Sequence, residues 1–293
     1  MNSLLSATLR WVLSSELRGK TKRALRRLSS TTLGKPLELD EFQYVLERKL
    51  CVRKNSSVLV HCSFGRLKAN FSPAQAVMTL KDLVGEGGNI LMPCYPGNGE
   101  EWLASGKVFD VQTTPIVTGV LAETFARTCG VRTSTHPIKA VAAWGKDRDF
   151  LIEGHHLSKT PYDSRSPYAK LLSLKNSLVI GLGTAKMSFY HCCEDSAPDY
   201  SRYLYTSNPV TGLCRTEDGS VEEVTTYVHR TEVLSGMPSS IEFLSRTRCP
   251  SYTVLEYRRR MFYAGDVRSI YRHVRDELAR SEESRELGVN DEK

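Results

Sequence analysis

Apolar and polar positions after Pro36 follow two different rhythms. Short, nearly continuous apolar runs are typical of buried strands, and they occupy residues 57–61, 89–93, 141–144 and 177–183. Longer segments with apolar residues at helical spacing predict helices at residues 39–50, 72–84 and 118–128. Strands that alternate with helices predict an α/β fold, in which a three-layer α/β/α sandwich is built around a mostly parallel sheet.

The pattern changes after Thr211. Residues 221–229 are rich in β-branched side chains with imperfect alternation, which predicts a small antiparallel β insertion or subdomain toward the C-terminus. Residues 264–283 predict a closing helix. The chain therefore divides into an N-terminal arm at 1–36, one large domain at 37–283 and a frayed tail at 284–293.

The N-terminal arm is strongly basic. Residues 1–35 contain eight Lys and Arg side chains and one acidic residue, interleaved with leucines and Trp11. This pattern predicts a basic amphipathic helix on an anionic membrane surface, with a transit peptide or a solvated tail as the alternatives. Because the excess of basic over acidic residues is confined to this arm and no recognition motif follows, we expect no nucleic-acid partner.

The composition argues against a membrane-spanning protein and against a disulfide-rich one. No apolar run approaches the roughly 20 residues that span a bilayer. The eight cysteines contain no CxxC pair and no regular framework, which indicates reduced thiols, a cytoplasmic location and no metal site. Together with the basic arm, this leaves peripheral association with the inner face of a membrane as an open alternative.

Candidate chemistry gathers at the ends of the predicted strands. His191 and Glu194 follow the strand at 177–183, and a helix that begins near Ser188 would put both on one face. The familiar glycine-rich nucleotide motifs and the GxSxG motif of serine hydrolases are absent. Histidines lie near strand ends or in loops at positions 61, 136, 155, 156 and 191.

Six blocks of sequence share their order and spacing with one known family. They lie at residues 58–65, 85–93, 109–125, 134–145, 155–168 and 187–195, the last containing the His191 and Glu194 pair. In this order they resemble the aminoglycoside 3-N-acetyltransferase family. The double histidine and the form of the last block look more similar to members associated with surface-polysaccharide amino sugars. Two departures, Thr133 in place of an arginine and Ala140 in place of a serine, put individual donor contacts in doubt.

The resemblance implies transfer of an acetyl group from acetyl-CoA to a primary amine by direct attack on the thioester. It implies catalytic roles for His191 and Glu194 and for His155 or His156, with His155 favoured because Leu157 then falls at the family's spacing. Backbone N–H groups in the turn at 62–64 or near Ser188 would stabilise the thioester oxygen. The residues implied to bind acetyl-CoA are His61, Cys62, Ser63, Phe64, Ser134, His136 and Ser188.

Three functions remain open from the sequence. The first is an acetyl-CoA-dependent N-acetyltransferase for an amino sugar of surface polysaccharide. The second is an aminoglycoside 3-N-acetyltransferase that confers antibiotic resistance, and the third is an inactive binding protein at a membrane surface. The expected partners are a small-molecule amine and CoA. The oligomeric state is open, with a homodimer as one alternative.

Overall fold

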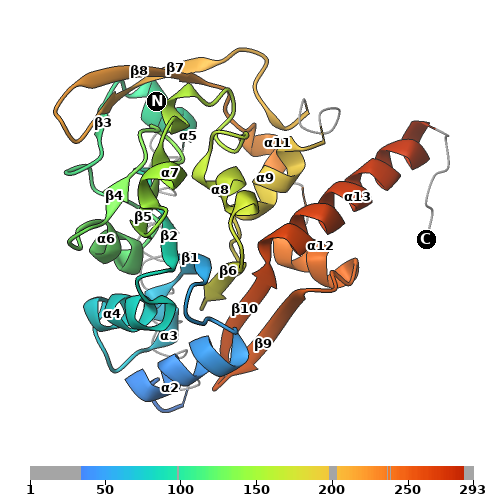
Figure 1. Cartoon of the computed structure of the whole chain (residues 1–293). Coiled ribbons are helices and arrows are strands. Elements are labelled where there is room, and N and C mark those ends of the chain that lie inside the picture. The colour runs from blue at the N-terminus through green and yellow to red at the C-terminus, as the bar shows by residue number, and fades with distance from the viewer. Residues whose placement is uncertain (1–33, 98, 198–202, 236, 238, 287–293) are drawn as a thin grey trace, which may run out of the picture.

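The computed structural model describes residues 34–97, 99–197, 203–235, 237 and 239–286 (Figure 1). The predictions for an amphipathic arm and for the last residues of the tail therefore lie almost entirely outside the described residues. Within the described part of the chain, no helix is both long and apolar enough to cross a membrane.

A central sheet organises the described residues. Its strand order is β4-β5-β2-β1-β6-β10-β9. The three middle strands run parallel to one another, whereas the outer strands on both sides pair in antiparallel fashion. The strands are β1 (Ser57–Cys62), β2 (Asn89–Pro93), β4 (Arg132–Thr133), β5 (Val141–Gly145), β6 (Ser177–Leu182), β9 (Tyr252–Tyr257) and β10 (Arg260–Asp266).

Alternate residues of the middle strands face two apolar layers. Val58 and Val60 of β1 pack with one layer, whereas Leu59 between them packs with the other. The first layer contains side chains of α2 (Leu39–Tyr44), α4 (Pro73–Val84) and α6 (Val120–Ala126). The second contains side chains of α7 (Arg148–Ile152), α8 (Pro167–Lys170), α9 (Phe189–Asp195), α12 (Ser240–Arg246) and α13 (Val267–Glu286). The predicted α/β/α layering is confirmed.

A separate small sheet crosses the top of the molecule in Figure 1. It consists of β3 (Val108–Asp110), β7 (Val210–Arg215) and β8 (Val221–Thr226). Strands β7 and β8 form the antiparallel hairpin that the sequence predicted. The pairing with β3 is parallel, so this sheet also joins two distant parts of the chain.

Several element boundaries differ from the prediction for local reasons. Residues 264–266 belong to β10 rather than to the closing helix, because they pair with β6 and the Asp266 carboxylate accepts the Ser269 N–H at 2.8 Å. The short helix α5 (Gly99–Ala104) lies in a segment for which the apolar pattern predicted neither a helix nor a strand. By contrast, the helix predicted at 72–84 begins as expected, and Ser72 caps α4 through a reciprocal capping box with Gln75.

The remaining short helices complete the described chain. A π-helical segment at Val45–Lys49 continues α2, and 3-10 turns lie at His155–Leu157 and Leu171–Ser173. Helix α3 (Phe64–Leu67) follows β1 directly, and α11 (Thr231–Ser235) follows the small sheet.

Candidate active site

The parallel strands β1, β2 and β6 end at the same edge of the central sheet. Two hollows meet at this edge. The first, the strand hollow, has a volume of about 130 Å3 and is lined by His61, Cys62, Met92, Pro93, Thr118 and Thr184, among others. The second, the helix hollow, has a volume of about 340 Å3 and lies against α9, α11 and α12. Both hollows are lined by Tyr95, Lys186 and Ser188, so a ligand in one can meet a ligand in the other.

His191 and Glu194 form a hydrogen-bonded pair in the helix hollow. They lie three residues apart on α9, and His191 Nδ1 is 2.7 Å from Glu194 Oε2. Glu194 is fully buried, whereas the His191 side chain is 27% exposed. Among the described residues, nothing bonds to Glu194 Oε1. The carboxylate can therefore hold the imidazole in one tautomer while the other ring nitrogen faces a ligand.

Other aromatic and imidazole rings lie close to His191. Its ring centre lies 5.2 Å from that of Tyr162 and 4.7 Å from that of His229, and His229 in turn stacks on Tyr205 at 4.4 Å. Burial and the nearby His191 hold the pKa of His229 well below its ordinary value, so this imidazole is neutral. Sequence reasoning gave no role to His229. The only available signal was its place at the end of the β-branched strand, 38 residues from His191.

His61 supports the start of α9 from the end of β1. Its Nε2 accepts the backbone N–H of Ser188 at 2.8 Å. Burial, with a smaller contribution from His191, lowers the pKa of His61 to about 3, which keeps the ring neutral and able to accept this bond. His61 thus connects the end of β1 to the segment that follows β6.

The turn that follows His61 contributes less to the hollow than its sequence suggested. Cys62 lines the strand hollow, but burial raises the pKa of its thiol, so the group stays protonated. The Ser63 N–H donates to the Leu182 carbonyl, and the Phe64 ring packs against Phe71 in the first apolar layer. Because the N–H groups of Ser63 and Ser188 are both engaged, neither is available to stabilise a thioester oxygen.

His155 belongs to a buried polar network with Ser134 and His136. Its Nδ1 lies 2.8 Å from Ser134 Oγ, and its Nε2 lies 3.2 Å from the Pro161 carbonyl oxygen. The ring stacks on His136 at 4.4 Å, and burial lowers the pKa of His155 to about 3. With both ring nitrogens engaged and no exposed surface, His155 has the geometry of a structural residue. We do not propose it as the base.

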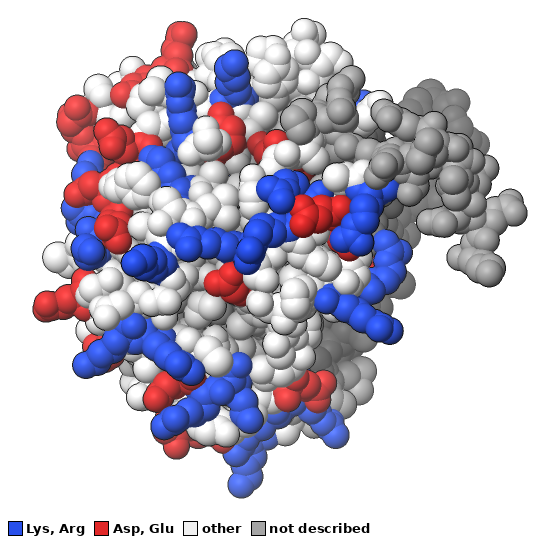
Figure 2. All heavy atoms as spheres, turned by 45° about the vertical axis from the view of Figure 1, so that its right-hand side comes forward, with Lys and Arg blue, Asp and Glu red and all other residues white. Residues whose placement is uncertain are grey.

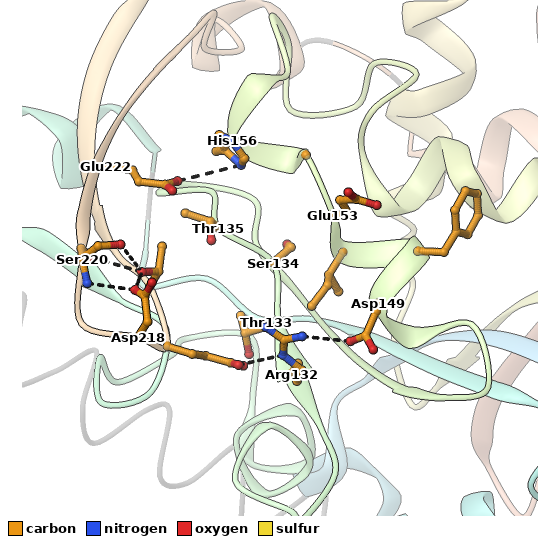
Figure 3. A pocket seen from close by; sticks show the side chains of 15 residues that line it. Arg132, Thr133, Ser134, Thr135, Asp149, Glu153, His156, Asp218, Ser220 and Glu222 are labelled. Atoms are coloured by element: carbon orange, nitrogen blue, oxygen red, sulfur yellow. Dashed lines mark hydrogen bonds and ion pairs between the residues drawn. The ribbon is translucent and has the colours of Figure 1, made fainter.

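His156 lies elsewhere, in a third and larger hollow (Figure 3). This acidic hollow has a volume of about 870 Å3 and shares no lining residue with the helix hollow. His156 Nδ1 is 3.9 Å from Glu222, and Arg132 bonds to both Asp149 and Glu217. Five carboxylates line it, from Asp149, Glu153, Glu217, Asp218 and Glu222.

Fold and site together define an α/β protein with an acid–base pair at the carboxyl edge of its parallel strands. A model of the family described as "Aminoglycoside 3-N-acetyltransferase" matches residues 59–272, and the chain belongs to this family. The resemblance of the six sequence blocks is thereby confirmed.

Two relatives match over part of their length. The chain is 30% identical over 149 residues to aminoglycoside N(3)-acetyltransferase IV of Salmonella sp, which covers 50% of this chain and 54% of the relative. It is 27% identical over 184 residues to the aminoglycoside N(3')-acetyltransferase-like protein YokD of Bacillus subtilis (strain 168), covering 56% and 66% respectively. The matches thus span about half to two thirds of these relatives.

Solved structures share the fold over a longer part of the chain. The structure of AAC-IIIb with CoASH matches with a TM-score of 0.66 at 18% identity and covers 83% of this chain and 97% of that one. AAC-VIa bound to sisomicin matches with a TM-score of 0.69 at 21% identity and covers 84% and 99%. At these identities the likeness concerns the fold.

Proposed function

We propose that this protein transfers an acetyl group from acetyl-CoA to a primary amine. The observation that carries the proposal is the His191–Glu194 pair, which lines the helix hollow and follows Ser188, a residue that lines both hollows. Membership of the acetyltransferase family and the fold shared with a CoA-bound structure support it.

His191 would act as the base. With Nδ1–H donating to Glu194, the Nε2 lone pair is free to take a proton from the acceptor's ammonium group. The resulting amine attacks the thioester carbon, the C–N bond forms and the C–S bond breaks. The leaving thiolate takes the proton held by His191, and the second proton of the new amide nitrogen passes to solvent.

The strand hollow is the proposed place for the pantetheine arm. The Thr118 hydroxyl lines it, and this oxygen is buried without a bond to any described residue, so it can bond to a ligand. The thioester would lie near Tyr95 and Ser188, which line both hollows. Since the Cys62 thiol stays protonated, direct attack is favoured over an acetylated cysteine.

An aminoglycoside is the proposed class of acceptor. The family and the relatives carry aminoglycoside names, and nothing in these comparisons points to surface polysaccharide, which the sequence had favoured. The acidic hollow supports this class, because carboxylates attract a polycation. An inactive binding protein would have no need for a buried carboxylate bonded to a partly exposed imidazole.

The test is thiol release from acetyl-CoA with a panel of aminoglycosides and amino sugars. We expect His191→Ala to lower kcat by about 100- to 10,000-fold, the range typical of a lost general base, and Glu194→Gln to lower it less. His273→Ala is the matched control, because that imidazole bonds to Thr247 and lines neither the strand hollow nor the helix hollow. Release only with amino sugars would contradict the acceptor class, and no release with any amine would contradict acetyl transfer.

A further inference from the structure

The bond to Glu194 leaves the orientation of His191 incompletely fixed. A single hydrogen bond at Nδ1 holds one atom of the ring, but it permits the ring plane to turn about the bond direction. The orientation of the ring plane therefore needs a second constraint. Packing against the buried part of the His191 side chain can supply it, because only 27% of that side chain is exposed. The ring contacts on this side chain come from Tyr162, Tyr190 and His229.

His229 is the nearest of these rings. The two ring centres are 4.7 Å apart with planes inclined by 57°, a geometry within the range of favourable ring contacts. Tyr190 is farther away, at 6.4 Å, and lies on α9 itself. His229 therefore provides a contact from a different element, which can resist rotation of the His191 side chain relative to α9.

The backbone and ring of His229 are themselves held firmly. Tyr205 and His229 form an antiparallel bridge, with Thr206 N–H donating to Val228 and Arg230 N–H to Leu204. The His229 ring stacks between its neighbours, 4.4 Å from Tyr205 and 5.5 Å from Tyr162. A side chain fixed in this way can transmit its position to the ring that it touches.

The contribution of His229 is made by the packing of its ring and not by a hydrogen bond. The residue is 8% exposed, and no described residue bonds to its buried Nε2. A hydrogen bond from this atom therefore does not hold His191. Burial also keeps the ring neutral, so it adds no positive charge beside an imidazole that must accept a proton.

We propose that His229 is a positioning residue for His191, whose ring packing sets the plane of the proposed base. The inference rests on the proposed function of His191, but it concerns a contact across two distant parts of the chain. The loss of this contact lowers kcat, because a base displaced by about 1 Å can lose roughly 100-fold in rate. The KM for acetyl-CoA stays unchanged, since His229 does not line the strand hollow.

Three variants test this proposal. We expect His229→Ala to lower kcat by roughly 10- to 100-fold. His229→Phe keeps the ring faces and removes no bond to a described residue, so its kcat stays within about 3-fold of the wild type. The control is Val228→Ala. Val228 is buried in the same segment, but its side chain packs with Leu103 and Ile138. We therefore expect this variant to lower the unfolding temperature with little change in kcat.

Nuclear magnetic resonance of labelled histidine gives a readout that needs no acceptor. The His191 Nδ1–H signal, assigned with His191→Ala, should broaden through faster exchange with water in His229→Ala, because a ring that turns away weakens the bond to Glu194, and should stay sharp in His229→Phe and Val228→Ala. An unchanged signal and kcat in His229→Ala, or an equal loss in His229→Phe, overturns the proposal. If the wild type transfers no acetyl group, the proposed function fails. The His191 Nδ1–H signal still decides whether His229 positions the His191 ring.

Discussion

Asp195 places a second, partly buried carboxyl next to the His191–Glu194 pair. Burial raises the pKa of Asp195 to about 6, although hydrogen bonds from Thr160 and Tyr205 and the nearby His191 act in the opposite direction. In the unfolded chain an aspartate has a pKa near 3.9. Between about pH 4 and pH 6 the unfolded chain thus releases a proton that the folded protein keeps. Stability falls as pH rises through this window and levels off above it.

Replacement of Asp195 by asparagine should remove this pH dependence. We expect Asp195→Asn to be more stable than the wild type above pH 6, by on the order of 3 kcal/mol at most, with the difference shrinking toward pH 4. The measurement is urea unfolding of both proteins at pH 4.5 and pH 7.5. A difference that is the same at both pH values would show that the charge of Asp195 does not carry the effect.

Local pairs of residues were easier to predict than distant ones. His191 and Glu194 lie three residues apart on one helix, and the structure brings them together as their spacing indicated. His229 reaches the same place through the hairpin β7–β8 and a bridge to Tyr205, and no sequence period expresses such a path. Likewise, only the pairing of β1 with β6 reveals that the Ser63 N–H is already engaged.

Strand β6 has a glycine, Gly181, directly opposite Tyr263 of the neighbouring antiparallel strand β10. A Cβ atom at Gly181 would lie 1.9 Å from the ring of Tyr263. The absence of that atom lets the Tyr263 ring lie over β6, from where its hydroxyl donates to the Lys186 carbonyl. The Tyr263 side chain of the β9–β10 hairpin therefore holds the segment that leads from β6 to Ser188 through a hydrogen bond.

A pair of substitutions separates the space at Gly181 from the hydrogen bond. We expect Gly181→Ala to lower the free energy of unfolding by about 1–3 kcal/mol, because the tyrosine ring must move. Tyr263→Phe keeps the ring and loses about 1 kcal/mol with the hydroxyl. Both are measured by urea unfolding. Gly265→Ala in β10, whose Cβ would meet the flexible end of Ile270 at 2.4 Å, is the comparison, and an equal cost there would argue against a special role for Tyr263.

Elements with strong local signals were predicted well, and those that depend on pairing were not. Strands β1 and β2 and helix α4 have continuous apolar runs or clear caps, and they appear within a residue or two of their expected bounds. Strand β5 forms a hairpin with β4, and this hairpin sets the direction in which β5 runs. Because β4 has only two residues, it is too short to give a recognisable sequence pattern. The hairpin β9–β10 was missed because Arg258, Arg259 and Arg260 interrupt its apolar residues.

Charge is distributed differently over the arm and the rest of the molecule. Of the 40 basic and 33 acidic residues, eight and one lie within residues 1–35, so the remainder of the chain is balanced. Figure 2 accordingly shows basic and acidic side chains intermingled over the face that contains α13. Against this background, the five carboxylates of the acidic hollow are a local concentration of one sign.

Loss of charge in the acidic hollow should affect polycationic acceptors selectively. We expect the double variant Glu153→Gln, Glu222→Gln to raise the KM for an aminoglycoside by roughly 3- to 10-fold at low salt and less at high salt, because the carboxylates are partly exposed. The KM for a small monoamine should not change. Glu256→Gln on the exposed strand β9 is the control. An equal change in KM for both acceptors would show that the acidic hollow does not attract the polycationic substrate.

The C-terminal position of β10 and α13 sets an order of events during synthesis. Residues of the second apolar layer extend as far as Val274 and Leu278 of α13, which packs against α9, the helix of His191 and Glu194. Apart from Phe262, the fully buried residues of the first layer end at Leu182, and β9 and β10 add only partly buried side chains to it. On the ribosome, the layer beneath α4 and α6 can thus collapse early. The His191 side of the sheet stays incompletely covered until α13 has emerged, and until then it is the surface that a chaperone would meet.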